Sequence, residues 1–123
     1  MTVTMFGIAN CDTVKRAKTW LNEQGIAIDF HDYKKLGIDG ATLRAWVDEF
    51  GWEPLLNKAG TTFRGLADED KHHIDEHKAI ALMLANPSMI KRPVLDLGER
   101  RIVGFKPEMY EAVFNDLCQS QGF

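Results

Sequence analysis

Residues 2–33 read TVTMFGIANCDTVKRAKTWLNEQGIAIDFHDY, and this stretch decides the fold. It opens with a β-rich run over residues 2–6. From Asp12 to Gln24 the apolar residues recur every three or four positions, as on one face of a helix, and Gly25 is suited to end that helix. Residues 26–33 alternate apolar and polar side chains, which is typical of a half-buried strand. This order predicts a β-α-β unit with two parallel strands and a right-handed crossover.

The segment that follows is expected to be mainly helical. Residues 34–40 have the composition of a loop, and Asp39 is a candidate N-cap for the next helix. The apolar spacing then predicts helices over residues 41–50, 53–57, 61–66 and 71–86. Pro87 ends the last of them, because proline cannot continue a helix. A helical insert of about fifty residues, 34–87, therefore follows the β-α-β unit.

After Pro87 the pattern changes to a β-hairpin and a final helix. Residues 94–97 and 101–105 are the predicted strands, and Gly98 supplies the turn between them. Pro107 suits the first turn of the last helix, since its missing N–H has no helical partner there. The whole order, β-α-β, helical insert, β-β-α, predicts one α/β domain over residues 1–123.

The composition and net charge of the chain indicate a globular protein and argue against some functions. The chain has 123 residues, 45% of them hydrophobic and 27% charged, which is typical of a globular domain. The formal net charge of −3 argues against a general nucleic-acid binder, because phosphate contacts need a basic surface. Residues 1–6 have neither a basic start nor a long apolar run, so we expect no membrane segment, no secretory signal and a cytoplasmic location.

The two cysteines, Cys11 and Cys118, are too few for a disulfide framework. Cys11 stands where a strand ends and a helix starts, so free backbone N–H groups and the positive end of the helix dipole favour its thiolate. Such a position lowers a thiol pKa from about 8.5 into the range of roughly 3.5–7.5, more so with the nearby cations Lys15 and Arg16. A buried, inert cysteine is the alternative interpretation.

Two further motifs contain residue types that can carry chemistry. Arg92 precedes Pro93 at the entrance of the hairpin, where a cis proline would aim the arginine at a neighbouring site; a trans proline beside a solvated arginine is the alternative. His73 and His77 are four residues apart on an expected helix, but no third ligand has recognisable spacing. We therefore expect a solvated helical face there and no metal site.

The residues from Phe6 to Ala17, FGIANCDTVKRA, together with Arg92-Pro93-Val94, resemble the arsenate reductase (ArsC)/Spx family, and most of all its YffB-type branch. The resemblance implies a thioredoxin-like fold with a mixed four-stranded sheet. Residues 1–33 and 88–123 would form the thioredoxin-like core, interrupted by the helical insert. It also implies that Cys11 is the redox thiol and that Pro93 is the cis proline beside it.

The resemblance also separates the activities found in this family. Its arsenate reductases surround the oxyanion with three arginines, which suits a doubly charged group that needs several forked donors. Here Arg92 matches one of them, whereas Lys106 and Asn57 stand where the others are expected. Lysine keeps the positive charge of arginine but lacks its forked pair of donors, and asparagine has neither. The resemblance therefore gives weaker support to arsenate as the substrate.

Spx-type regulators bind RNA polymerase and often carry a Cys-x-x-Cys switch, which this sequence lacks after Cys11. A polymerase-binding regulator, docking through the helical insert or around Gly51, is the alternative function. Cys118 is expected to be a spectator rather than a resolving thiol.

The sequence thus predicts a monothiol oxidoreductase with Cys11 as nucleophile, no bound cofactor, and glutathione as co-substrate. Glutaredoxin is a candidate partner, and a small oxyanion or a mixed disulfide is the candidate substrate. The other candidate binding residues are Asn10, Thr13, Lys15, Arg92, Pro93 and Lys106. Their cations are expected to pair with the glutathione carboxylates, while the backbone beside Pro93 receives the peptide in an extended pose.

Overall fold

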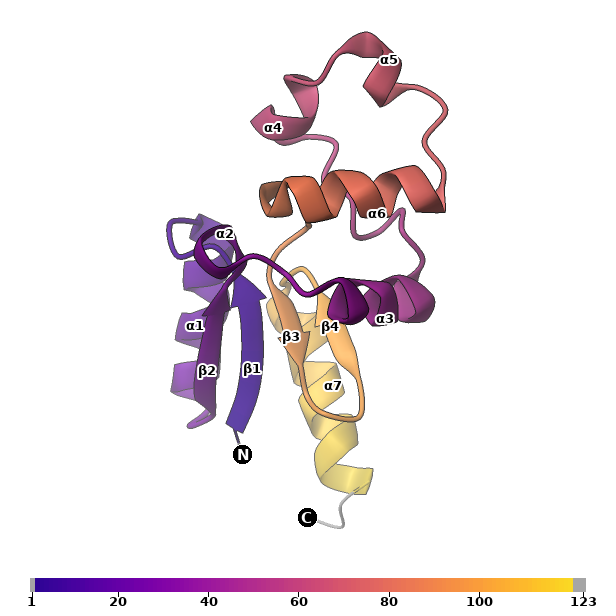
Figure 1. Ribbon diagram of the computed structural model, residues 1–123. Helices are drawn as coiled ribbons and strands as arrows, with labels where there is room; N and C mark the ends of the chain where they lie inside the picture. Colours follow the sequence, from indigo (N-terminus) through magenta and orange to yellow (C-terminus); the bar gives the residue numbers. More distant parts are fainter. Residues whose placement is uncertain (1, 121–123) are drawn as a thin grey trace.

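Four strands form one mixed sheet in the order β2-β1-β3-β4 in the computed structural model, which describes residues 2–120 (Figure 1). Strand β1 (Thr2–Gly7) runs parallel to β2 (Ala27–Asp32) and antiparallel to β3 (Val94–Asp96). Strand β4 (Arg101–Val103) pairs with β3 as a hairpin. The predicted mixed four-stranded sheet and thioredoxin-like α/β fold are confirmed.

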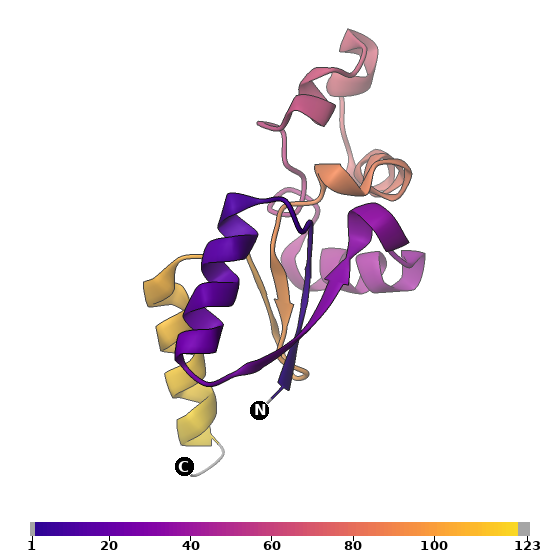
Figure 2. The same cartoon turned by 90° about the vertical axis from the view of Figure 1, so that its left-hand side faces the viewer.

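Helices α1 (Asp12–Glu23) and α7 (Pro107–Ser120) cover one face of this sheet, and α3 (Gly40–Phe50) lies on the other side (Figure 2). Because side chains alternate along a strand, each strand serves both faces. Val3 and Met5 pack toward α1 and α7, in a cluster that also contains the buried Leu21, Tyr110 and Phe114. The next residue, Phe6, packs against the cluster on the opposite side.

The chain between β2 and β3 is helical, as expected, but its boundaries differ from the prediction. Its elements are α2 (Tyr33–Leu36), α3, α4 (Thr61–Arg64), α5 (Asp68–Lys71), α6 (Glu76–Ala85) and the short 3-10 helix η1 (Pro87–Met89). Within residues 2–120, no helix combines the length and apolar character that crossing a membrane requires.

Three local predictions in this segment are wrong. Residues 33–36 form a helical turn instead of a strand end and loop, because Asp32 accepts hydrogen bonds from the backbone of Lys34 and Lys35. Residues 53–57 are not helical; Leu56 instead forms a β-bridge with Ile90.

The long helix predicted from residue 71 begins only at Glu76. His73 has a left-handed backbone with φ of 56°, which ends any helix, and Asp75 caps α6 by accepting from the backbone of Lys78. His73 and His77 therefore do not share a helical face. The predicted N-cap at Asp39 is confirmed, since its carboxylate accepts from the backbone of Thr42.

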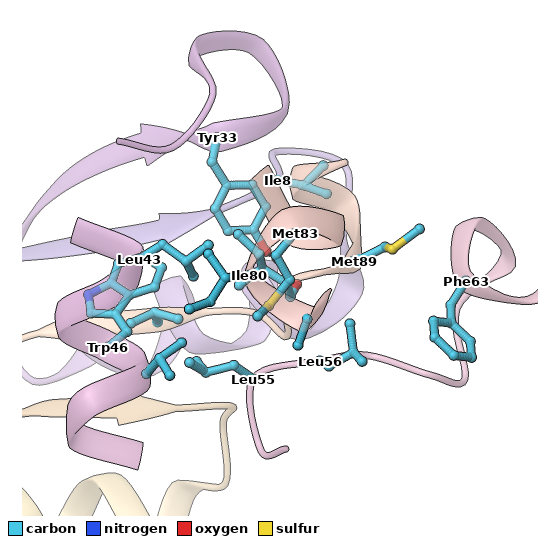
Figure 3. Packing of buried hydrophobic residues seen from close by; sticks show 14 residues of the cluster. Ile8, Tyr33, Leu43, Trp46, Leu55, Leu56, Phe63, Ile80, Met83 and Met89 are labelled. Carbon is cyan, nitrogen blue, oxygen red and sulfur yellow. Dashed lines mark hydrogen bonds between the residues drawn. The ribbon is translucent and has the colours of Figure 1, made fainter. Parts of the chain in front are cut away.

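A second hydrophobic cluster joins the helical segment to the sheet. Figure 3 shows Tyr33, Leu43 and Trp46 converging on it from α2 and α3, close to Ile80 of α6. Tyr33 is fully buried, and its hydroxyl donates to the backbone oxygen of Ile90 over 2.8 Å. This hydrogen bond ties α2 to the segment that leads into β3.

Two buried tyrosines provide a matched test of this hydrogen bond. Tyr33→Phe leaves the carbonyl of Ile90 without its donor, so we expect a loss of about 1–3 kcal/mol in the free energy of unfolding, measured with urea. Tyr110 is equally buried, but its hydroxyl has no partner within residues 2–120. Tyr110→Phe should therefore be neutral or stabilising. Equal losses in the two variants would contradict this assignment.

Candidate active site

Cys11 lies at the junction of the two hydrophobic clusters, where the loop after β1 enters α1. It is the N-cap of α1, with an extended backbone (φ −140°, ψ 125°), and its carbonyl accepts the first helical hydrogen bond from Lys15 at 3.0 Å. The side chain is half-buried and packs against both clusters. A Cβ at Gly7 would lie 2.9 Å from Val14, so only glycine lets the first turn of α1 approach β1 this closely.

The surroundings of Cys11 lower the pKa of its thiol. Burial acts in the opposite direction and is the largest single influence, because it disfavours the charged form. It is outweighed by the backbone N–H groups of Val14 and Thr13, which face a thiolate at this position, together with the hydrogen bond and positive charge of Arg92. These influences increase the fraction of Cys11 present as the thiolate, which is the nucleophilic form of the side chain.

Arg92 is held in place from the helical segment. Its Nη1 donates to the backbone oxygen of Ser88 over 2.9 Å, and its guanidinium also lies beside the hydroxyl of Tyr33. The Arg92–Pro93 peptide bond is cis. The buried Nε of Arg92 has no partner within residues 2–120. The guanidinium is therefore anchored at one nitrogen, while its hydrogen bond and positive charge act on Cys11.

A cavity of about 540 Å³ opens beside Cys11. Four of the predicted site residues line it together: Cys11, Thr13, Arg92 and Lys106. Asn57, which stands where a further arginine was expected, lines it as well. Elements far apart in the sequence thus form one site.

The remaining predicted residues lie elsewhere. Lys15 lines a neighbouring cavity, and Asn10 is exposed and outside the lining of both cavities. Pro93 is buried, with its carbonyl accepting from the backbone of Gly104 at 2.8 Å. The side chain of Cys118 lies outside the described part of the chain. Within that part, no group of three acidic, histidine or cysteine side chains is arranged to hold a metal.

Two further cations of the site were not among the predicted binding residues, although Arg16 was expected to help lower the pKa of Cys11. Arg16 and Lys91 also line the cavity, so that its charged lining, Cys11 aside, consists of four basic side chains and no carboxylate among the described residues. Lys91 adjoins Arg92, and Arg16 is one helical turn beyond Asp12, so both were near recognised residues. For Lys91, the sequence signal was a cationic stretch that runs from Lys91 to Lys106.

The fold and the site together define a thioredoxin-like protein with a cysteine, Cys11, at the N-terminus of a helix. Residues 6–113 match the model of the ArsC family, and the chain belongs to that family. A solved structure of a YffB protein is 59% identical, with a TM-score of 0.86, covering 89% of this chain and 96% of that one. The resemblance to the YffB-type branch is therefore confirmed.

Other relatives extend the comparison. The solution structure of an arsenate reductase (ArsC) related protein from Brucella melitensis is 53% identical, covers 93% of this chain and 95% of its own, and has a TM-score of 0.75. An uncharacterised protein of Haemophilus influenzae is 38% identical over 91% of this chain and 98% of its own length. The global transcriptional regulator Spx of Streptococcus mutans is 26% identical over 89% of this chain and 81% of its own.

The depressed pKa of Cys11 can be measured by alkylation. The rate of reaction with iodoacetamide is proportional to the thiolate fraction. The midpoint of its pH dependence should therefore lie below the ordinary thiol pKa of about 8.5. Arg92→Gln should move the midpoint to higher pH, because it removes a cation and a hydrogen bond that favour the thiolate. Lys91→Gln removes one charge from the same cavity and is the control, with the smaller effect. A wild-type midpoint at or above the ordinary value contradicts the activated thiolate.

Proposed function

We propose that this protein is a monothiol oxidoreductase of the ArsC family that works with glutathione in a reducing cytoplasm. The observation that carries the proposal is the position of Cys11, whose thiolate is favoured by backbone N–H groups and by Arg92 at the edge of a cationic cavity. A lowered pKa increases the fraction of Cys11 present as the nucleophilic thiolate, and the cavity gives an anionic thiol compound access to it.

Glutathione has the chemistry that suits this cavity. It carries two carboxylates, and the lining offers basic groups from three parts of the chain, Arg16, Arg92 and Lys106. The backbone N–H and C=O of Arg92 have no hydrogen-bond partner within the described residues, so they are available to an extended peptide beside Pro93. Both features support the binding of glutathione next to Cys11.

The reaction can be written as two balanced exchanges. The Cys11 thiolate forms a disulfide with the glutathione sulfur of a mixed disulfide, while the original S–S bond breaks and its electron pair leaves with the departing thiolate. A second glutathione, reacting as its thiolate, then attacks the glutathione sulfur bound to Cys11. This step releases glutathione disulfide and restores the Cys11 thiolate. One external thiol therefore replaces the second cysteine that a dithiol enzyme would use.

Among the substrates considered, a mixed disulfide fits better than arsenate. Arg92 supplies a forked guanidinium, whereas Lys106 is a single-point cation and Asn57 is neutral. Lys106 and Asn57 give less planar, bidentate recognition than arginines would, but a glutathione carboxylate needs only separate cations. Glutaredoxin remains a candidate partner for regenerating the thiol.

Replacing the nucleophile gives the direct test. Cys11→Ser should reduce turnover of a glutathione mixed disulfide to the uncatalysed rate, measured as glutathione disulfide formed. The reason is that a serine hydroxyl stays protonated at neutral pH and cannot replace the thiolate as nucleophile. Cys118→Ser is the matched control and should retain turnover if Cys118 is a spectator. An arsenate assay run in parallel identifies the oxyanion alternative. Full activity of Cys11→Ser would exclude the proposed nucleophile.

A regulatory function is the second candidate, and the match to Spx over 89% of the chain favours it. Spx-type proteins act by binding RNA polymerase, and the helical segment between β2 and β3 or the surface around Gly51 would be the interface here. Such binding does not require a second cysteine. It is compatible with the fold and independent of the Cys11 chemistry.

A pulldown separates this candidate from the oxidoreductase. With the purified chain as bait and the polymerase α subunit as prey, the oxidoreductase proposal expects no specific retention. Arg44→Glu on α3 and Lys15→Glu on α1 each reverse one exposed positive charge, and the two positions lie on opposite sides of the sheet. Retention that only Arg44→Glu abolishes would instead support a polymerase-binding surface on the helical segment.

A further inference from the structure

A second cavity adjoins the one that contains Cys11. It has a volume of about 470 Å³ and lies between the outer face of α1 and the start of α7. Three residues, Arg16, Phe105 and Lys106, line both cavities. The two spaces therefore share a wall next to the reactive thiol, and the proposed reaction with glutathione occupies only the first of them.

The second cavity combines aromatic walls with positive charge. Trp20 and Phe105 form the walls, and both rings meet the buried Tyr110 edge-on, with ring centroids 5.6 Å and 4.8 Å away. This packing fixes the two rings before any ligand arrives, which lowers the entropy cost of binding a flat group. The wall is preformed by the core of the domain.

The charges at its rim are Lys15, Arg16 and Lys106, opposed by the single carboxylate of Glu23. Within residues 2–120, none of the three cations forms an ion pair. Cations without a carboxylate partner are suited to an incoming anion. The arrangement thus favours a ligand that is both aromatic and negatively charged.

We propose that the second cavity binds the departing half of the mixed disulfide and that its preferred occupants are aromatic thiols bearing a carboxylate. This inference rests on the proposed function, since it places glutathione beside Cys11. When the Cys11 thiolate takes the glutathione sulfur, the leaving aromatic thiolate carries away the electron pair of the broken S–S bond beside Arg16 and Lys106. The same two cations therefore serve substrate binding and departure.

The test compares two mixed disulfides of glutathione, one with mercaptobenzoate and one with mercaptoethanol. Each rate is divided by its uncatalysed rate. Wild-type protein should show the higher kcat/KM with the mercaptobenzoate compound. Glu23→Gln removes the opposing carboxylate at the end of α1 and should raise that value about threefold, with a smaller increase for the mercaptoethanol compound, which has neither ring nor carboxylate. A gain of activity cannot arise from a folding defect.

Thr19→Glu introduces a carboxylate into the second cavity and should lower kcat/KM for the mercaptobenzoate compound about threefold. Thr61→Glu makes the same change at an exposed position on α4 and is the matched control. Equal effects on the two substrates, or no effect of Glu23→Gln, would overturn the second cavity as the leaving-group site. If wild-type protein reduces neither compound, the proposed function itself fails.

Discussion

The pKa of the Cys11 thiol depends on the close approach of α1 to β1, because this approach sets the direction of the N–H groups in the first turn of the helix. Val14 is fully buried against Gly7, and this contact fixes the first turn of α1 at the end of the sheet. The same turn presents the backbone of Thr13 and Val14 to the sulfur. The packing contact between Val14 and Gly7 thus positions two of the backbone N–H groups that lower the pKa of the thiol.

Arg92 joins this site to the rest of the molecule. Its guanidinium is anchored by Ser88, while the neighbouring Ile90 accepts from Tyr33 and pairs with Leu56. These partners all lie in the segment between β2 and β3. The charge that favours the thiolate therefore has its orientation set by residues outside the four-stranded sheet.

Much of the fold was predictable because its signals are local. The apolar spacing before Gly25 and the turn at Gly98 indicate their elements without any tertiary information. The wrong boundaries had side-chain or backbone causes that periodicity does not report: Asp75 caps α6 later than expected, and His73 adopts a left-handed conformation. The helical propensity of Lys71 to Asp75 was overridden by these two features.

The site residues also divide into those with a local sequence signal and those placed by tertiary packing. Cys11 and Arg92 carry motif signals, whereas the places of Arg16 and Lys91 in the cavity depend on how α1, the segment before β3 and the start of α7 meet in space. Tyr33 gave no chemical signal because its role is set by a hydrogen bond to a residue 57 positions away. Sequence patterns therefore predict Cys11 and Arg92, whereas tertiary packing determines which residues lie beside them.

The hydrogen bonds just before Arg92 have a consequence for protein engineering. Lys91 donates to the carbonyl of Leu55, and Asn57 donates to that of Met89, so the strand-like segment leading to Arg92 is bordered by the chain around Leu56. Trimming the helical segment to obtain a minimal thioredoxin scaffold would remove one wall of the cavity and the anchor of its arginine. In this protein the helical segment between β2 and β3 therefore supplies part of the cavity lining and holds Arg92 in place.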